Sequence, residues 1–140
     1  MGNRSLFYWA RNYTDLKRGD PYTELKRTVS INILDFVLFD AEKCPSYHSL
    51  FGIYDLETMQ KLTADFEMHF LELPKLSSLK VSEMSDLEKW LAYFSQKTPL
   101  EKLEEIAMSN PMIQKAIDTE AIFTSDQRMR RHYEKVEKAR

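Results

Sequence analysis

The stretch TVSINILDFVLF, residues 28–39, decides which fold this chain can adopt. It is rich in β-branched and aromatic residues, which are favoured in strands. Because side chains alternate across a strand, Val29 and Ile31 share one face while Leu34 and Phe36 share the other. Toward its end the run is apolar on both faces, which is typical of a strand in a sheet covered from two sides. The sequence therefore predicts a central strand over residues 28–39.

A helix and two further strands are predicted around this strand. Leu6, Trp9 and Tyr13 repeat at helical spacing, which predicts an amphipathic helix over residues 5–17. Its aromatic side chains are interpreted as core residues, with a base-stacking platform as the alternative. Alternation of apolar and polar residues predicts strands over residues 47–54 and 66–73. The short connections favour antiparallel pairing of at least two strands.

From residue 82 onward the apolar pattern has a helical period. Helix start signals are expected at four places. These are the capping box of Ser85 and Glu88, Thr98 as N-cap with Pro99 at the first helical position, Asn110-Pro111 and, for a last polar helix, Thr124 with Gln127. We therefore expect an α+β chain, with a core in residues 1–80 and a helical segment in residues 81–140.

Charge is distributed unevenly along the 140 residues, although the net charge is only −2. Residues 1–27 and 126–140 each hold six basic and three acidic side chains, whereas residues 28–125 hold eight and sixteen. The basic excess is small, so an ordinary solvated surface and a weak nucleic-acid footprint both stay open. The candidate nucleic-acid contacts are Arg4, Arg11, Lys17, Arg18, Arg128, Arg130 and Arg131.

Composition points to a folded cytoplasmic protein. With 43% hydrophobic residues, disorder throughout is not expected. The apolar runs are too short to span a membrane, and the first residues lack the apolar core of a signal peptide. The single Cys44 cannot form an internal disulfide, which fits a reducing compartment. We interpret Cys44 as a bystander.

A search for nuclease chemistry finds one short pattern. Glu24-Leu25-Lys26 spells the acid-x-lysine unit that metal-dependent nucleases use to hold Mg²⁺. It directly follows the turn at Pro21, however, and the nearest aspartates, Asp15 and Asp20, lie in the preceding helix end and turn. These groups would not converge from adjacent strands, so the pattern is predicted to be a coincidence.

The three histidines do not form a metal-ligand pattern in the sequence. His48, His69 and His132 are far apart, and none has a second histidine or cysteine at ligand spacing. On the predicted third strand, Glu67 and His69 share a face whereas Glu72 projects to the other. A structural histidine is therefore favoured over a ligand.

Short sequence features follow one another in a recognisable order from Arg4 to Lys75. They are Arg4 with Tyr8-Trp9, Gly19, Tyr22, Ile31-Asn32-Ile33-Leu34, Phe36, Tyr47-His48, Phe51, Leu62-Thr63, and His69 with Glu72-Leu73-Pro74-Lys75. With this order and spacing, the chain resembles the PD-(D/E)XK nuclease-family transposases, also called recombination-promoting nucleases.

The resemblance implies a partial restriction-endonuclease-like fold, with a small mixed or antiparallel sheet between an N-terminal helix and a C-terminal helical segment. Full-length members are expected to cut DNA with Mg²⁺. Their catalytic Asp and Glu-x-Gln (or Lys) unit lie before the helix that corresponds to residues 5–17. The resemblance thus implies that this chain is the C-terminal part of such a nuclease, without catalytic residues, metal ligands or cofactor of its own, and inactive alone.

Two other function classes stay open beside this interpretation. One is a non-catalytic module whose helical tail docks a protein or nucleic acid, and the other is an enzyme with an unrecognised site. A reading frame upstream of Met1 that encodes the Asp and Glu-x-Gln strands would favour the nuclease fragment. The strand at residues 28–39 would then lack one neighbour, and unpaired strand edges attract other chains. We therefore expect a homo-oligomer formed by strand pairing or helix exchange.

Overall fold

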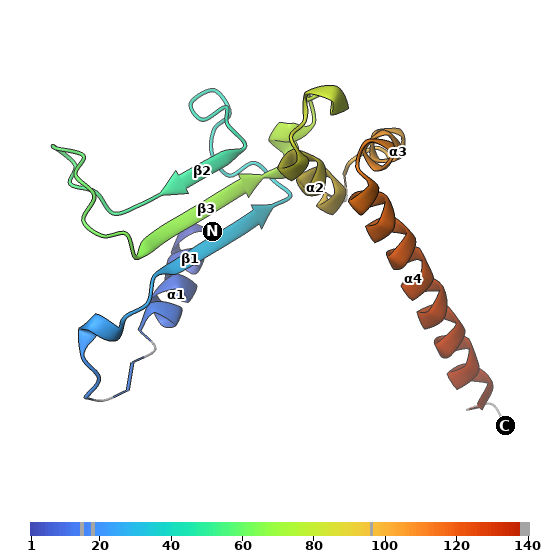
Figure 1. Cartoon of the computed structure of the whole chain (residues 1–140), viewed down its shortest axis with the longest axis horizontal. Helices are drawn as coiled ribbons and strands as arrows, with labels where there is room; N and C mark the ends of the chain where they lie inside the picture. The colour runs from blue at the N-terminus through green and yellow to red at the C-terminus, as the bar shows by residue number, and fades with distance from the viewer. Residues whose placement is uncertain (15, 18, 96, 138–140) are drawn as a thin grey trace. The chain divides into compact units, whose positions relative to one another are not determined.

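The computed structural model describes residues 1–14, 16–17, 19–95 and 97–137, with side chains described as far as residue 124. It divides into two compact units, Met1–Ser78 and Leu79–Arg140. The first contains a three-stranded sheet and helix α1, and the second contains helices α2, α3 and α4 (Figure 1). The predicted α+β class is therefore confirmed, and it is consistent with a partial restriction-endonuclease-like fold.

The sheet is mixed and has the strand order β1-β3-β2. Strand β3 (Phe66–Glu72) lies in the middle, parallel to β1 (Thr28–Leu34) and antiparallel to β2 (His48–Phe51). The expectation that at least one pair is antiparallel is confirmed. Within the described chain, β1 and β2 are both edge strands, each paired with β3 alone.

Strand β1 ends at Leu34 and does not reach residue 39, so the predicted length is wrong. The backbone N–H groups of Leu38 and Phe39 donate instead to the Glu72 carboxylate, at 2.6 and 3.0 Å. This carboxylate bends the chain away from the sheet, and the side chains of Leu38 and Phe39 return to the core. The second strand is also shorter than predicted, because after Phe51 the chain leaves the sheet.

Helix α1 (Gly2–Tyr13) packs on one face of the sheet, below β1 in Figure 1. The helix starts and ends earlier than the predicted range 5–17. The core on this face consists of Leu34, Phe66, Met68 and Phe70, against which Trp9, Leu38 and Phe39 are packed. An apolar groove of about 560 Å³ opens beside it, lined by Leu6, Trp9, Phe39, Phe51, Phe66 and Phe70, among others.

The opposite face of β1 is exposed. Val29, Ile31 and Ile33 keep 43%, 64% and 49% of their surface accessible. Coverage of this strand from two sides was therefore a wrong prediction for the described residues. Alternation places the three side chains on the face away from α1, and no described element packs over them.

The second unit begins with the 3-10 turn η3 (Val81–Glu83) and continues with α2 (Asp86–Phe94). The predicted capping box is confirmed, because the Glu88 N–H donates to Ser85 Oγ at 3.3 Å and the Ser85 N–H donates to Glu88 Oε2 at 2.7 Å. This exchange satisfies backbone donors that the first helical turn leaves without partners.

Helix α3 (Leu100–Ser109) begins one residue later than predicted. Its N-cap is Pro99, while the Thr98 hydroxyl donates to the Ala92 carbonyl at 2.7 Å and so does not cap α3. Helix α4 (Pro111–Glu137) begins after Asn110, as expected, but runs through Thr124 without the predicted restart. No described helix combines the length and hydropathy that a bilayer crossing requires.

Two further 3-10 turns flank the strands. One, η1 (Tyr22–Glu24), precedes β1, and the other, η2 (Leu73–Leu76), follows β3. Between α1 and η1, Gly19 has φ +100°, a left-handed conformation that glycine adopts readily. Helix α1 has already ended at Tyr13 with Thr14 as its C-cap, so Gly19 does not cap it.

Candidate nucleic-acid interface

The outer face of α1 presents two arginines and two aromatic rings. Arg4, Phe7, Tyr8 and Arg11 follow the i, i+3, i+4, i+7 spacing that puts side chains on one helix face. All four are exposed, and Phe7 and Tyr8 keep 63% and 47% of their surface accessible. The Arg4 guanidinium carbon lies 5.7 Å from the centre of the Tyr8 ring, within cation–π range. The Phe7 and Tyr8 rings meet edge to face at 5.6 Å.

The inner face of α1 holds this arrangement against the sheet. The Ser5 hydroxyl donates to Asn32 Oδ1 at 2.7 Å, and the Trp9 indole N–H donates to the Thr28 carbonyl at 2.8 Å. The Trp9 ring also packs edge to face on Phe66 at 4.6 Å. Buried polar groups need partners, and these two bonds supply them across the helix–sheet contact. The direction in which the outer face points is thereby fixed relative to β1.

The sequence interpretation of the α1 aromatics as core residues is therefore only half right. Trp9 is partly buried and Tyr13 stacks on it at 4.8 Å, whereas Phe7 and Tyr8 point outward. Helical spacing alone would have found this, because Phe7 and Tyr8 share their face with Arg4 and not with Trp9.

The structure brings together only part of the predicted basic set. Arg4 and Arg11 share the α1 outer face, and Lys17 is exposed in the turn that follows, where its N–H donates to Asp20 Oδ2 at 2.8 Å. Arg18 lies outside the described residues. Arg128, Arg130 and Arg131 fall within the α4 backbone, but their side chains also lie outside the described part.

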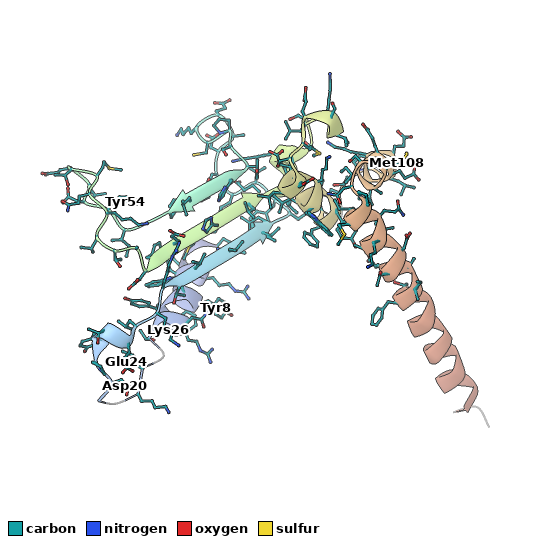
Figure 2. The ribbon with its side chains drawn as sticks, viewed as in Figure 1. Tyr8, Asp20, Glu24, Lys26, Tyr54 and Met108 are labelled. Carbon is teal, nitrogen blue, oxygen red and sulfur yellow. The ribbon has the colours of Figure 1, made fainter. Side chains whose placement is uncertain are left out.

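The acid-x-lysine pattern lies in the segment before β1. Figure 2 shows Asp20, Glu24 and Lys26 in the segment between α1 and β1, in turns and not on paired strands. All three side chains are exposed. Asp15 lies outside the described residues.

A row of charged and imidazole side chains lies across the exposed face of the sheet. Glu67 Oε2 lies 2.5 Å from an Arg27 guanidinium nitrogen and 3.8 Å from His69 Nε2, and Lys61 approaches the other oxygen at 3.6 Å. The hydrogen bond from Arg27 lowers the pKa of Glu67 from its ordinary value; partial burial opposes this, while the charges of Arg27 and Lys61 reinforce it.

His48 continues this row from β2. Its Nε2 lies 2.9 Å from His69 Nδ1, and the ring centres are 5.2 Å apart with planes only 19° from parallel. The two nitrogens are within hydrogen-bonding distance, and the tautomer of each ring decides which nitrogen donates. The sequence interpretation treated these histidines as far apart and missed this contact. The antiparallel register of β2 and β3 creates it by setting Leu50 opposite His69.

Glu72 lies on the other face of β3, as the alternation predicts, and is fully buried. Its Oε1 accepts the N–H groups of Leu38 and Phe39, and its Oε2 accepts from Lys75 Nζ at 2.7 Å. Burial raises the pKa of Glu72, but the hydrogen bonds from Lys75, Phe39 and Leu38 together with the Lys75 charge outweigh it, so the pKa is lowered.

Lys75 extends this contact to the loop before β2. Its ammonium group donates to the Cys44 carbonyl at 2.6 Å and, at 3.4 Å, to the carbonyl of Ser46. The Glu72–Lys75 pair thus connects Leu38 and Phe39, and the carbonyls of Cys44 and Ser46 in this loop, to the end of β3. Both side chains are occupied by structural contacts.

Comparison with known protein families shows to which family this chain belongs. The sequence profile described as PD-(D/E)XK nuclease family transposase matches residues 1–140. The chain belongs to this family. Comparisons with curated proteins and with solved structures gave no match. The match begins at residue 1 of this PD-(D/E)XK family chain, so it does not mark the chain as the C-terminal part of a longer member.

The described residues of this PD-(D/E)XK chain do not fit the Mg²⁺ that its family implies. Mg²⁺ sites use carboxylate oxygens that point into one octahedral shell. Here Glu67 and Glu72 lie on opposite sheet faces, and each is ion-paired with a lysine or arginine. No group of three or more His, Cys, Asp or Glu side chains that could hold a metal occurs in the described part of the chain.

Proposed function

We propose that this member of the PD-(D/E)XK nuclease family binds nucleic acid weakly and without sequence preference, and that by itself it does not cleave DNA. The observation that carries the proposal is the contrast between the outer face of α1 and the two carboxylates of β3. The outer face of α1 offers exposed cations and rings, which suit phosphates and bases. Glu67 and Glu72 lie on opposite sheet faces and each is ion-paired with a cation, so they do not form a carboxylate pair for a metal.

Binding would rest on Arg4 and Arg11 as phosphate contacts. Phe7 and Tyr8 add exposed rings on which unpaired bases stack. A contact between arginine and a phosphate does not depend on the base sequence of the nucleic acid, so no base preference is expected. That the chain is the C-terminal part of a longer nuclease stays a proposal, and the reading frame upstream of Met1 tests it.

The first expected result is an intact plasmid. Metal-assisted hydrolysis needs the ion to activate water and to offset phosphate charge, and each tenfold in rate corresponds to about 1.4 kcal/mol of barrier. Purified protein incubated with supercoiled plasmid and Mg²⁺ or Mn²⁺ should leave the plasmid supercoiled on an agarose gel. Nicking that co-elutes with the protein, stops with EDTA and is lost in Glu67→Gln would contradict the proposal.

The second expected result is salt-sensitive binding. Each phosphate contact contributes a slope of roughly −0.9 in log affinity against log salt on duplex DNA. Two arginines therefore predict about a tenfold loss of affinity between 50 and 200 mM salt. Fluorescence anisotropy with a labelled oligonucleotide measures this directly.

Charge-matched variants locate the binding surface. Arg4→Ala/Arg11→Ala should abolish most of the anisotropy change, whereas Lys43→Ala/Lys115→Ala removes the same charge from exposed positions elsewhere and should retain it. Equal losses in both double variants would mean that net charge, and not the α1 face, determines binding.

A further inference from the structure

We propose that the contact between His48 and His69 is sensitive to protons and controls how firmly β2 is held to β3. The contact persists while the two rings carry at most one positive charge between them, and it breaks when both rings are charged. Lowering the pH through the range in which imidazole gains its charge therefore loosens β2. This goes beyond nucleic-acid binding and does not depend on it.

The carboxylate of Glu67 selects the tautomer of the neutral pair. Glu67 Oε2 lies 3.8 Å from His69 Nε2, so an N–H at Nε2 is favoured over a lone pair that would face the carboxylate. His69 Nδ1 then carries the lone pair and accepts from the N–H of His48 Nε2, 2.9 Å away. The remaining lone pair of His48 is on Nδ1, which takes no part in the contact.

The first added proton leaves the contact intact. It binds to His48 Nδ1 and makes His48 a cation whose Nε2–H still donates to His69 Nδ1, and such charge-assisted bonds are stronger than neutral ones. A second proton can bind only at His69 Nδ1, the nitrogen whose lone pair accepts this bond. Both nitrogens are then donors, so the hydrogen bond is lost, and two cations face each other with ring centres 5.2 Å apart.

Glu67 stays charged while the two rings gain their protons. It is paired with Arg27 and approached by Lys61, and the hydrogen bond from Arg27 lowers the pKa of Glu67 from its ordinary value. One negative charge that already faces two cations does not offset two imidazolium rings as well. Repulsion between the doubly charged rings therefore remains.

The other described neighbours of the pair keep the same charge over this range. The ring of Tyr47 stacks on His48 at 6.3 Å, and phenols titrate far above it. Ile31 of β1 and Leu50 of β2 lie opposite His69 in the register, and both are apolar. Among the groups described around this contact, only the two histidines change charge between pH 8 and pH 5.

Strand β2 is the element that responds. It is four residues long and, within the described chain, is paired with β3 alone. His48 begins this strand, so its contact with His69 joins the first residue of β2 to β3 on the exposed face of the sheet. At the other end of β2, Phe51 lines the apolar groove. Loosening β2 therefore also loosens one wall of this groove.

Chemical shifts of the imidazole nitrogens, measured by NMR on the full chain, test the order of protonation. At pH 8, His69 should show a protonated Nε2 and an unprotonated Nδ1; a protonated Nδ1 would contradict the assigned donor and acceptor. As the pH falls, the two rings should gain charge one after the other, whereas in His48→Gln the ring of His69 should follow a single-site curve. Independent single-site curves for both rings of the wild type would overturn the proposal.

Amide hydrogen exchange measures how firmly β2 is held. A coupling that separates two titrations by one pH unit corresponds to about a tenfold change in an equilibrium constant. Corrected for the intrinsic exchange rate, the protection of the β2 amides should therefore fall about tenfold between about pH 7.5 and pH 5. This range ends above the reference pKa of a glutamic acid, about 4.3, so titration of Glu72 does not contribute.

His132→Gln is the matched control, because it removes a histidine from α4 in the second unit. The control should keep the tenfold fall, whereas His48→Gln and His69→Gln should each show little change in protection between the two pH values. Far-UV circular dichroism checks that each variant is folded. Unchanged protection of β2 in the wild type, or a tenfold fall that persists in both His48→Gln and His69→Gln, would overturn the proposal.

Discussion

Replacing Glu72 with glutamine is expected to lower the free energy of unfolding of the first unit by about 3–5 kcal/mol, the range for breaking a buried ion pair from one side. Glu72 has no accessible surface, and the Lys75 side chain is only 5% exposed. Glutamine keeps an oxygen for the Leu38 and Phe39 N–H groups but leaves the Lys75 ammonium without its counter-charge. Such an unpaired buried cation accounts for most of the expected loss.

The measurement needs a probe that reports on this unit alone. The chain has two tryptophans, Trp9 in α1 and Trp90 in α2. In a Trp90→Phe background, urea unfolding followed by tryptophan fluorescence reports on Trp9. Adding Lys75→Met to Glu72→Gln should recover much of the loss, because the double variant has no buried charge at either position. If the two changes were simply additive, the ion pair would not be the cause.

Lowering the pH should destabilise the first unit through the same residue, Glu72. Because the folded state lowers the pKa of Glu72, its contribution is present above the unfolded value of about 4.3 and is lost as pH falls through the lower folded value. The wild type should therefore lose stability below about pH 4.3, and Glu72→Gln should lose less over the same range. Glu67 titrates in both proteins and does not affect this difference.

Periodicity predicted those parts of the fold that depend on local pattern. The alternation in β1 and β3, the opposite faces of Glu67 and Glu72 and the capping box at Ser85 were all readable from the sequence. In each case one residue's direction follows from its neighbours along the chain, and no distant partner has to be known.

Other features depended on contacts between distant segments. Residues 35–39 carry a strong strand composition, yet the strand ends at Leu34, and the N–H groups of Leu38 and Phe39 bond to a carboxylate from β3 in place of a strand partner. The His48–His69 contact needs the register of β2 against β3, which no spacing within the chain gives. Phe7 and Tyr8 are a different case, because their helical spacing with Arg4 was readable from the sequence and only their apolar character was used to place them in the core.

Replacing Phe70 with alanine is the second large expected effect. Phe70 is almost fully buried at the centre of β3, and its ring meets Phe39 and Phe51 edge to face at 5.6 and 5.7 Å. Removing a buried phenylalanine ring typically costs about 3–5 kcal/mol through lost burial and the cavity left behind. Phe70 also lines the apolar groove, so water can reach the vacated space and the lower half of that range is expected.

Two further variants show whether the cost of Phe70→Ala comes from lost packing of the ring or simply from lost apolar area. Phe70→Leu retains most of the buried hydrocarbon and should cost less than half as much in the same Trp9 urea experiment. Leu62→Ala removes an apolar side chain that is 77% exposed and should change the free energy of unfolding by no more than about 0.5 kcal/mol. Phe39 reaches Phe70 from the loop after β1 and Phe51 reaches it from β2. This ring therefore joins a loop that the backbone ladder does not connect to the sheet. A loss below about 1 kcal/mol for Phe70→Ala would mean that these rings are not packed together in solution, and that the Glu72–Lys75 pair alone secures the loop to the sheet.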